Sequence, residues 1–181
     1  MIKNKPFYIL LLLFFIYGSL FSQEKSTGPI LEEYGAVWNI PNPTYSTPTN
    51  KEYKVVFDIM NSPDSPSELN ASIETAARFL NMHAQAGVPK ENLKVALVIH
   101  NKASKDLLEN SFYQKKYKVN NPNKGLINDL MKADVDIIFC GQSSLSRNIP
   151  ITETIEGTKL ALSAMTALIQ LQREGYQLIK F

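Results

Sequence analysis

The sequence predicts an α/β protein, a three-layer sandwich in which helices cover both faces of a mostly parallel sheet. Short apolar runs rich in β-branched residues alternate with segments whose apolar residues recur every three or four positions. Strands that alternate with helices pair in parallel, because each connection crosses over the sheet. The 181 residues, 44% of them hydrophobic, suffice for one core. We therefore expect a single α/β domain over residues 53–181.

The first 22 residues have the layout of a secretory signal peptide. Lys3 and Lys5 precede an apolar run from Phe7 to Tyr17, and small and polar residues lead to the expected cleavage after Ser22. This run is shorter than the about 20 apolar residues that a membrane-spanning helix needs. We expect an exported protein, periplasmic or secreted and free of the membrane after cleavage, with an uncleaved anchor as the alternative.

The formal net charge of +2 comes from the signal segment, which contains two lysines and no acid. The remaining chain is close to neutral, so its charge predicts no binding to nucleic acid. Lys115, Lys116 and Lys118 form a small basic cluster, which we interpret as a solvated loop.

Residues 23–52 are rich in Pro, Gly and Asn, which predicts an extended N-terminal arm. Trp38 is expected to dock on the domain or on a neighbouring subunit, and a free arm is the alternative. The first strand is expected at Tyr53–Met60, where the apolar run is nearly continuous.

A helix is expected to follow, with its N-terminus at Ser65-Pro66-Ser67-Glu68 and its end at Gly87 and Pro89. The next strand, Leu93–Ile99, completes a right-handed βαβ crossover. The remaining expected elements are a short helix from Ser104 to Leu108, a polar flap or surface loop over Glu109–Asn120, a helix from Asn121-Pro122 to Asp134, a strand at Val135–Phe139, a helix over Thr158–Glu174 and a last strand at Tyr176–Phe181.

Polar residues follow each of the first three expected strands, at the edge where parallel sheets bind ligands. The candidate binding and catalytic residues are Asn61 and Ser62 after the first strand, His100 and Asn101 after the second, and Cys140, Gly141, Gln142 and Ser143 after the third. His100 reaches Cys140 if their strands are neighbours, but the sequence does not give the strand order.

Cys140 is the only cysteine. In an exported protein it has no internal disulfide partner, so the thiol is buried, paired with another chain, or reactive. A reactive thiol needs groups that stabilise the thiolate. Backbone N–H groups of residues 141–144 could do so, and His100 or Arg147 could supply charge or a proton. The alternative is an inert core cysteine beside a structural histidine.

Other kinds of site find no support in the sequence. Gly141-Gln142-Ser143-Ser144-Leu145 lacks the final glycine of a hydrolase nucleophile elbow. Phosphate-binding glycine loops are absent, and one cysteine with two histidines does not make a structural zinc site. We expect neither a metal nor a cofactor.

From about Gly28 to Phe181 the sequence resembles the DsrE/DsrF-like family, in particular its exported members of the Bacteroidetes type. The matching segments are Lys54-Val55-Val56-Phe57-Asp58, Val98-Ile99-His100, Asn121-Pro122-Asn123, Phe139-Cys140-Gly141-Gln142-Ser143 and Leu171-Gln172-Arg173-Glu174-Gly175-Tyr176. Leu145 and Arg147 also fit the relatives' pattern, whereas Asn101 stands where exported relatives often have glycine.

The resemblance implies an α/β fold of flavodoxin-like appearance and subunits that assemble as trimers or hexamers. It also implies a cysteine after the third strand that carries persulfide sulfur in the sulfur-relay relatives, a position that matches Cys140. Our first hypothesis is therefore a sulfur carrier or sulfurtransferase that uses Cys140 and His100 and meets a sulfur donor or acceptor protein. The alternatives are a non-catalytic module that binds a small ligand or a partner, and a structural oligomer with an inert thiol.

Overall fold

The computed structural model describes residues 24–180, and the predicted signal segment lies outside this range. Its five strands form one sheet in the order β4-β3-β2-β1-β5, and every described pairing is parallel. The strands are β1 (Tyr53–Ile59), β2 (Leu93–Ile99), β3 (Asp136–Cys140), β4 (Lys159–Ala161) and β5 (Gln177–Ile179). The predicted α/β architecture is confirmed.

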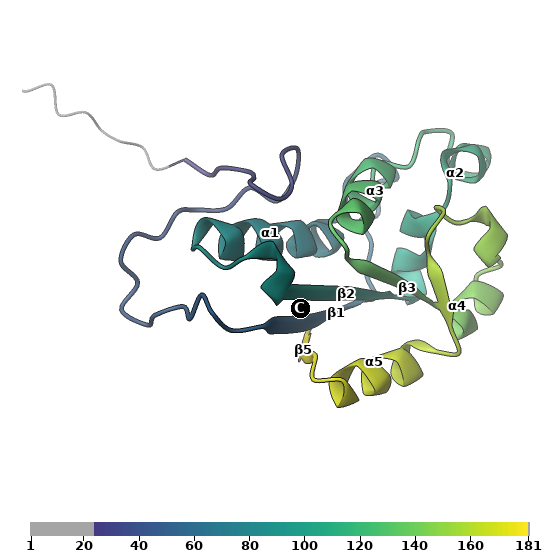
Figure 1. Cartoon of the computed structure of the whole chain (residues 1–181). Coiled ribbons are helices and arrows are strands. Elements are labelled where there is room, and N and C mark those ends of the chain that lie inside the picture. Colours follow the sequence, from purple (N-terminus) through teal and green to yellow (C-terminus); the bar gives the residue numbers. More distant parts are fainter. Residues whose placement is uncertain (1–23, 181) are drawn as a thin grey trace, which may run out of the picture.

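Helices cover both faces of this sheet (Figure 1). They are α1 (Ala71–Gln85), α2 (Asn110–Tyr117), α3 (Lys124–Lys132), α4 (Gly141–Ser146) and α5 (Ala164–Arg173), with short 3-10 turns η1 (Lys90–Asn92), η2 (Asn101–Leu107) and η3 (Ile151–Glu153). Helices α1 and α3 lie on one side of the sheet and α5 on the other, so the molecule has three layers (Figure 1).

The strand residues alternate between two hydrophobic cores because successive side chains point to opposite faces. The larger core joins Phe57, Leu97 and Phe139 to the apolar faces of α1 and α3. The smaller core joins Val98 and Cys140 to α5. Cys140 therefore belongs to the thinner of the two layers, which a single helix covers.

Three expected helices begin or extend differently. Helix α1 starts at Ala71 with Asn70 as its N-cap, whereas Ser65-Pro66 forms a turn before it. Helix α3 starts at Lys124 after Asn121-Pro122. The expected helix over Thr158–Glu174 is wrong in its first part, because Lys159–Ala161 pairs with β3 as strand β4 and α5 begins only at Ala164.

The polar segment after Glu109 is not a loop, since Asn110–Tyr117 forms helix α2. Helix α2 ends at Lys118, whose φ of 66° is the left-handed conformation that commonly terminates helices. Cys140 is the last residue of β3, one position beyond the expected end of that strand.

The N-terminal arm packs against α1 through its first part. Leu31 and Val37 are buried, and the fully buried Asn81 of α1 binds the arm's backbone. Gly35 has a φ of +71°, and a Cβ at this position would lie 2.4 Å from the carbonyl carbon of Ala77, so only glycine fits there. Trp38 is 49% exposed, with Lys25 Nζ 5.6 Å from its ring centroid.

Within residues 24–180, no helix combines the length and the apolar character that crossing a membrane requires.

Candidate functional site

The strand order brings the expected site residues together at one edge of the sheet. Strand β2 lies between β1 and β3, with Ile99 level with both Ile59 and Phe139. The residues that follow these positions are Met60, His100 and Cys140. The sequence did not give the strand order. In the structure β2 and β3 are neighbours, so His100 and Cys140 lie at the ends of adjacent strands.

The thiol of Cys140 is enclosed by hydrogen-bond donors. Its side chain is 4% exposed and sits where β3 passes directly into α4. Burial raises the pKa of the thiol, but hydrogen bonds from the N–H and hydroxyl of Ser143 and from the N–H groups of Ala164 and Gln142 outweigh burial and lower the pKa below its usual value. The first turn of α4 and the first residue of α5 therefore both favour the thiolate.

This arrangement bears on the three interpretations of the lone thiol. Cys140 is buried as a free cysteine, and at 4% exposure it cannot meet a thiol of another chain without local rearrangement. An inert apolar environment would raise the pKa, whereas the donors here lower it. The site is buried and still chemically suited to an anionic sulfur.

Gly141 allows the backbone to pass close to the neighbouring strand. A Cβ at this position would lie 2.7 Å from the Ala161 carbonyl oxygen and 3.2 Å from the Leu162 carbonyl oxygen. Any larger residue would push α4 away from β4 and move the donors around the sulfur. The next residue, Gln142, points its side chain outward, where Nε2 donates to the Leu162 carbonyl at 3.4 Å.

Asn101, Ser143 and Arg147 form a network that joins the end of β2 to α4. Ser143 Oγ accepts from the N–H of Asn101 at 3.0 Å, and Arg147 donates to Asn101 Oδ1. Asn101 has a φ of 51°, the left-handed region that asparagine and glycine tolerate best. Glycine, which often occupies this position in exported relatives, can adopt the same backbone conformation. Of the two residues, only asparagine supplies a side-chain oxygen that binds Arg147.

His100 binds a carboxylate that we did not select from the sequence. Its Nε2 lies 2.7 Å from Asp58 Oδ1 on β1, and Lys180 Nζ lies 2.9 Å from Asp58 Oδ2. The side chain of Asp58 is 6% exposed and that of His100 is 21% exposed, so the carboxylate is largely shielded from water and the imidazole only partly. An ionised carboxylate only accepts hydrogen bonds, so the neutral His100 tautomer that pairs with it carries its proton on Nε2 and leaves Nδ1 able to accept a hydrogen bond.

His100 is not among the groups that hydrogen-bond the sulfur in residues 24–180, where those donors come from α4 and α5. Asp58 and His100 alternate with residues of the larger core, so both lie on the same face of the sheet as Cys140. The signal that could have identified Asp58 is a lone acid inside a buried strand, since such a charge needs a partner.

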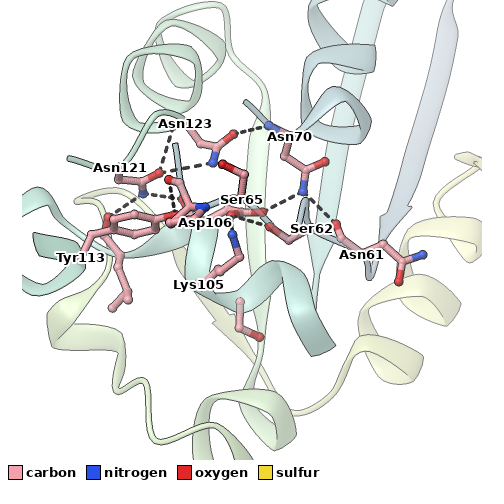
Figure 2. Close-up of polar contacts among 12 residues, drawn as sticks. Asn61, Ser62, Ser65, Asn70, Lys105, Asp106, Tyr113, Asn121 and Asn123 are labelled. Atoms are coloured by element: carbon pink, nitrogen blue, oxygen red, sulfur yellow. Dashed lines mark hydrogen bonds and ion pairs between the residues drawn. The ribbon is translucent and has the colours of Figure 1, made fainter. Parts of the chain in front are cut away.

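Asn61 and Ser62 belong to a second polar cluster, centred on the fully buried Asp106 (Figure 2). Ser62 Oγ donates to Asp106 Oδ1 at 2.8 Å, and Asn70 Nδ2 donates to Asp106 Oδ2 at 2.7 Å and to the Asn61 carbonyl at 2.8 Å. Of Asn61, only the backbone takes part, and its side chain is exposed.

Burial raises the pKa of Asp106, although Asn70, Lys105 and Ser62 oppose this effect. Asn121 Nδ2 extends the cluster by donating to the Asp106 carbonyl at 2.7 Å (Figure 2). The cluster therefore fixes η2, and through Asn70 the start of α1, relative to the sheet.

No group of three or more His, Cys, Asp or Glu side chains suited to a metal ion occurs in the part of the chain that the structure describes.

The fold and the site define an α/β protein that presents a single donor-stabilised thiol at the carboxyl edge of a parallel sheet. A family model described as DsrE/DsrF-like family matches residues 54–181. The chain belongs to the DsrE/DsrF-like family.

Solved structures agree with this fold. The protein of unknown function MTH1491 from Methanobacterium thermoautotrophicum has a TM-score of 0.56 and 17% identity, covering 72% of this chain and 100% of that chain. The ychN protein from E. coli has a TM-score of 0.52 and 19% identity, covering 71% of this chain and 99% of that chain. At these identities the likeness concerns the fold alone. A search of curated proteins found no significant match.

Proposed function

We propose that this protein is an exported sulfur carrier in which Cys140 accepts a sulfane sulfur as a persulfide and passes it on. The observation that carries the proposal is the set of donors from α4 and α5 that lowers the pKa of the thiol despite its burial. Family membership supports the same chemistry, because the sulfur-relay relatives carry persulfide on a cysteine after the third strand, a position that Cys140 matches.

The proposed reaction is a thiolate exchange. The Cys140 thiolate attacks the outer sulfur of a polysulfide or protein persulfide, a new S–S bond forms, and the donor's inner sulfur leaves as a thiolate with the electron pair of the broken S–S bond. The terminal sulfur of the Cys140 persulfide is then taken up by an acceptor thiolate, which returns Cys140 to its thiolate form. No external oxidant or reductant is needed.

His100 has the role of accepting and returning the proton that Cys140 loses when it is activated. Asp58 fixes the tautomer by taking the Nε2–H, which leaves Nδ1 as the base. Asp58 is thus a positioning residue, and His100 is the proton carrier.

Mass spectrometry of the intact protein after exposure to polysulfide tests the proposal. Wild-type protein should gain sulfur mass, and this gain should disappear after treatment with a reductant. Cys140→Ser should gain none. Equal labelling of the two proteins, or no labelling of the wild type under conditions that label free cysteine, would refute it.

His100→Gln and Asp58→Asn separate proton transfer from structure. Both variants should form persulfide more slowly than wild type near neutral pH and approach the wild-type rate at higher pH, where the thiolate forms without a base. A merely structural role would lower the rate by the same factor at every pH.

The protein is further proposed to work as a homo-oligomer. Exposed apolar side chains gather on α5 and beside it, where Met165 is 72% and Leu162 73% exposed, and Ile169 and Leu160 are about half exposed. Such a surface favours contact with another subunit. Light scattering should show an oligomer for the wild type and a smaller species for a Met165→Glu, Ile169→Glu variant, while Gln170→Glu on the same helix serves as the control.

Export is tested by fractionating cells that produce the whole chain and sequencing the N-terminus of the protein recovered. We expect the periplasmic or secreted fraction and a first residue of Gln23. Recovery only with the cytoplasm, or an intact Met1 in the membrane fraction, would contradict it.

A further inference from the structure

A cavity of about 540 Å³ opens beside the Asp106 cluster, between η2, α2 and the end of α4. Four cationic side chains and one carboxylate line it: Lys102, Lys105, Lys116, Arg147 and Asp64. Cys140 is not part of the lining, so this cavity differs from the thiol site. Of the residues expected at the carboxyl edge from the sequence, Ser62 and Arg147 line it.

Lys105 is the most buried of the four cations, and its Nζ lies 5.8 Å from the centroid of the Tyr117 ring. Its Nζ is buried and is the one side-chain nitrogen or oxygen within residues 24–180 that is buried without any hydrogen bond. Asp106 Oδ1 lies 3.5 Å away, but both oxygens of that carboxylate already accept shorter bonds from Ser62 and Asn70 (Figure 2). An ammonium has three donors, and leaving them unused in a buried position is costly.

The other three cations lack a carboxylate partner. Within residues 24–180, neither Lys102 nor Lys116 nor Arg147 forms an ion pair; Lys116 lies over the Tyr117 ring, and Arg147 is oriented by Asn101. Like charges around one cavity repel each other, and the single lining carboxylate, Asp64, cannot balance them. The cavity therefore favours an anionic ligand.

The remaining walls are partly apolar and include Tyr117, Pro63 and Ile149. Burial raises the pKa of the Tyr117 phenol, and Asp106 raises it further while Arg147 lowers it, so the hydroxyl stays protonated near neutral pH and is able to donate. A bare tetrahedral anion would contact the cations and leave these walls unused.

We infer that this cavity binds a small organic molecule that carries a tetrahedral oxyanion, a phosphate or sulfate group, with Lys102, Lys116 and Arg147 around the oxyanion, the buried charge of Lys105 behind them, and Tyr117, Pro63 and Ile149 against the organic part. The inference goes beyond sulfur transfer and does not depend on the reactivity of Cys140.

Isothermal titration of the full protein with phenyl phosphate tests the inference, with phenol and benzoate as controls for the ring and for a single carboxylate charge. Phenyl phosphate should bind more tightly than inorganic phosphate, because it also covers the apolar walls. Its affinity should fall as salt is added, since charge pairing is screened. Phenyl sulfate, titrated in parallel, distinguishes the source of the oxyanion: tighter binding of the sulfate ester assigns a sulfated ligand, and tighter binding of the phosphate ester a phosphorylated one.

Lys102→Met and Lys116→Met each keep the aliphatic stem and remove one charge. Each should weaken binding of phenyl phosphate about tenfold or more, because charge-assisted hydrogen bonds are among the strongest. Lys115→Met is the matched control, since it removes a lysine from the same helix that does not line the cavity. Lys105→Met is measured only together with its melting curve, because it also leaves Asp106 without its cation.

The inference is overturned if no oxyanion binds at millimolar concentration, or if Lys115→Met weakens binding as much as Lys102→Met and Lys116→Met. Benzoate binding as tightly as both esters would equally exclude a tetrahedral oxyanion site. The titrations use protein that has not met polysulfide, so their outcome is independent of persulfide formation on Cys140.

Discussion

Replacing Asn81 with alanine should release the N-terminal arm from α1. Asn81 is fully buried, and its carboxamide makes five hydrogen bonds to the arm. Oδ1 accepts from the N–H groups of Ile30 and Leu31, and Nδ2 donates to the carbonyls of Leu31, Tyr34 and Gly35. Alanine can replace none of these bonds.

The expected loss follows from two routes that the variant can take. If the arm stays docked, five bonds worth a net of about 0.5–1.5 kcal/mol each are missing. If the arm leaves, Leu31 and Val37 return to water at about 1.5–3 kcal/mol each, and the conformational entropy that the freed chain regains offsets part of this loss. We therefore expect Asn81→Ala to lower the free energy of unfolding by about 2–4 kcal/mol.

Urea denaturation gives this energy, and limited proteolysis shows whether the arm is released. The variant should be cleaved within residues 24–52 under conditions in which the wild-type arm resists, while residues 53–180 stay protected. Gln170→Ala, on the exposed side of α5, is the control. Unchanged stability together with an equally resistant arm would refute the account of Asn81.

Three further predictions concern the thiol of Cys140, the neighbouring Gly141 and the partly buried His83. The rate at which Cys140 reacts with a small thiol reagent should rise with pH, and the midpoint of this rise should lie at a lower pH than for free cysteine. Ser143→Ala should move the midpoint to higher pH. The same midpoint in wild type and Ser143→Ala would contradict the role of the Ser143 hydroxyl. Gly141→Ala should lower the free energy of unfolding by about 1–3 kcal/mol, measured in urea, because its Cβ meets the Ala161 carbonyl; a stability equal to wild type would show that the backbone yields freely. Burial lowers the pKa of His83 despite its hydrogen bond to a backbone carbonyl, so the folded state binds fewer protons than the unfolded state. Stability should therefore fall as the pH drops below the ordinary histidine pKa of about 6.5. His83→Gln should lose less stability than wild type between pH 7.5 and 5.5, and equal losses in the two proteins would contradict a lowered pKa of His83.

Continuous apolar runs made the central strands predictable. The stretches that became β1, β2 and β3 are covered on both faces, so almost every position is hydrophobic and the pattern needs no knowledge of neighbours. Strand β4 is different, because it has three residues, two of them exposed, and exists only through its pairing with β3. Its sequence is as compatible with the first turn of a helix, which is how we interpreted it.

The start of α1 was missed for a tertiary reason. Ser65-Pro66-Ser67-Glu68 satisfies the local rules for a helix N-terminus. Asn70 is the N-cap instead, since Asp106 and Asn123, both far away in the sequence, bind its side chain and its N–H. These partners are distant in the sequence, so a rule based on neighbouring residues cannot predict that Asn70 begins the helix.

The candidate site was predictable in position and incomplete in composition. Topology alone placed His100 and Cys140 at strand ends. The partners that determine their chemistry come from elsewhere: Asp58 from near the end of β1 and Ala164 from the start of α5. Finding them requires the order of the strands and the path of the chain between β4 and α5, which depend on how the whole sheet assembles.

The enclosure of Cys140 by the first residue of α5 has a kinetic consequence. Cys140 is 4% exposed and Ala164 is among the groups that lower the pKa of its thiol, so we expect a reagent to reach the sulfur when the connection between β4 and α5 moves outward. Labelling should then rise with reagent concentration only until it reaches a ceiling set by the opening rate, and different small reagents should share that ceiling. A protein acceptor would meet the same ceiling unless its own docking opens the connection, so the speed of transfer would depend on which partner binds.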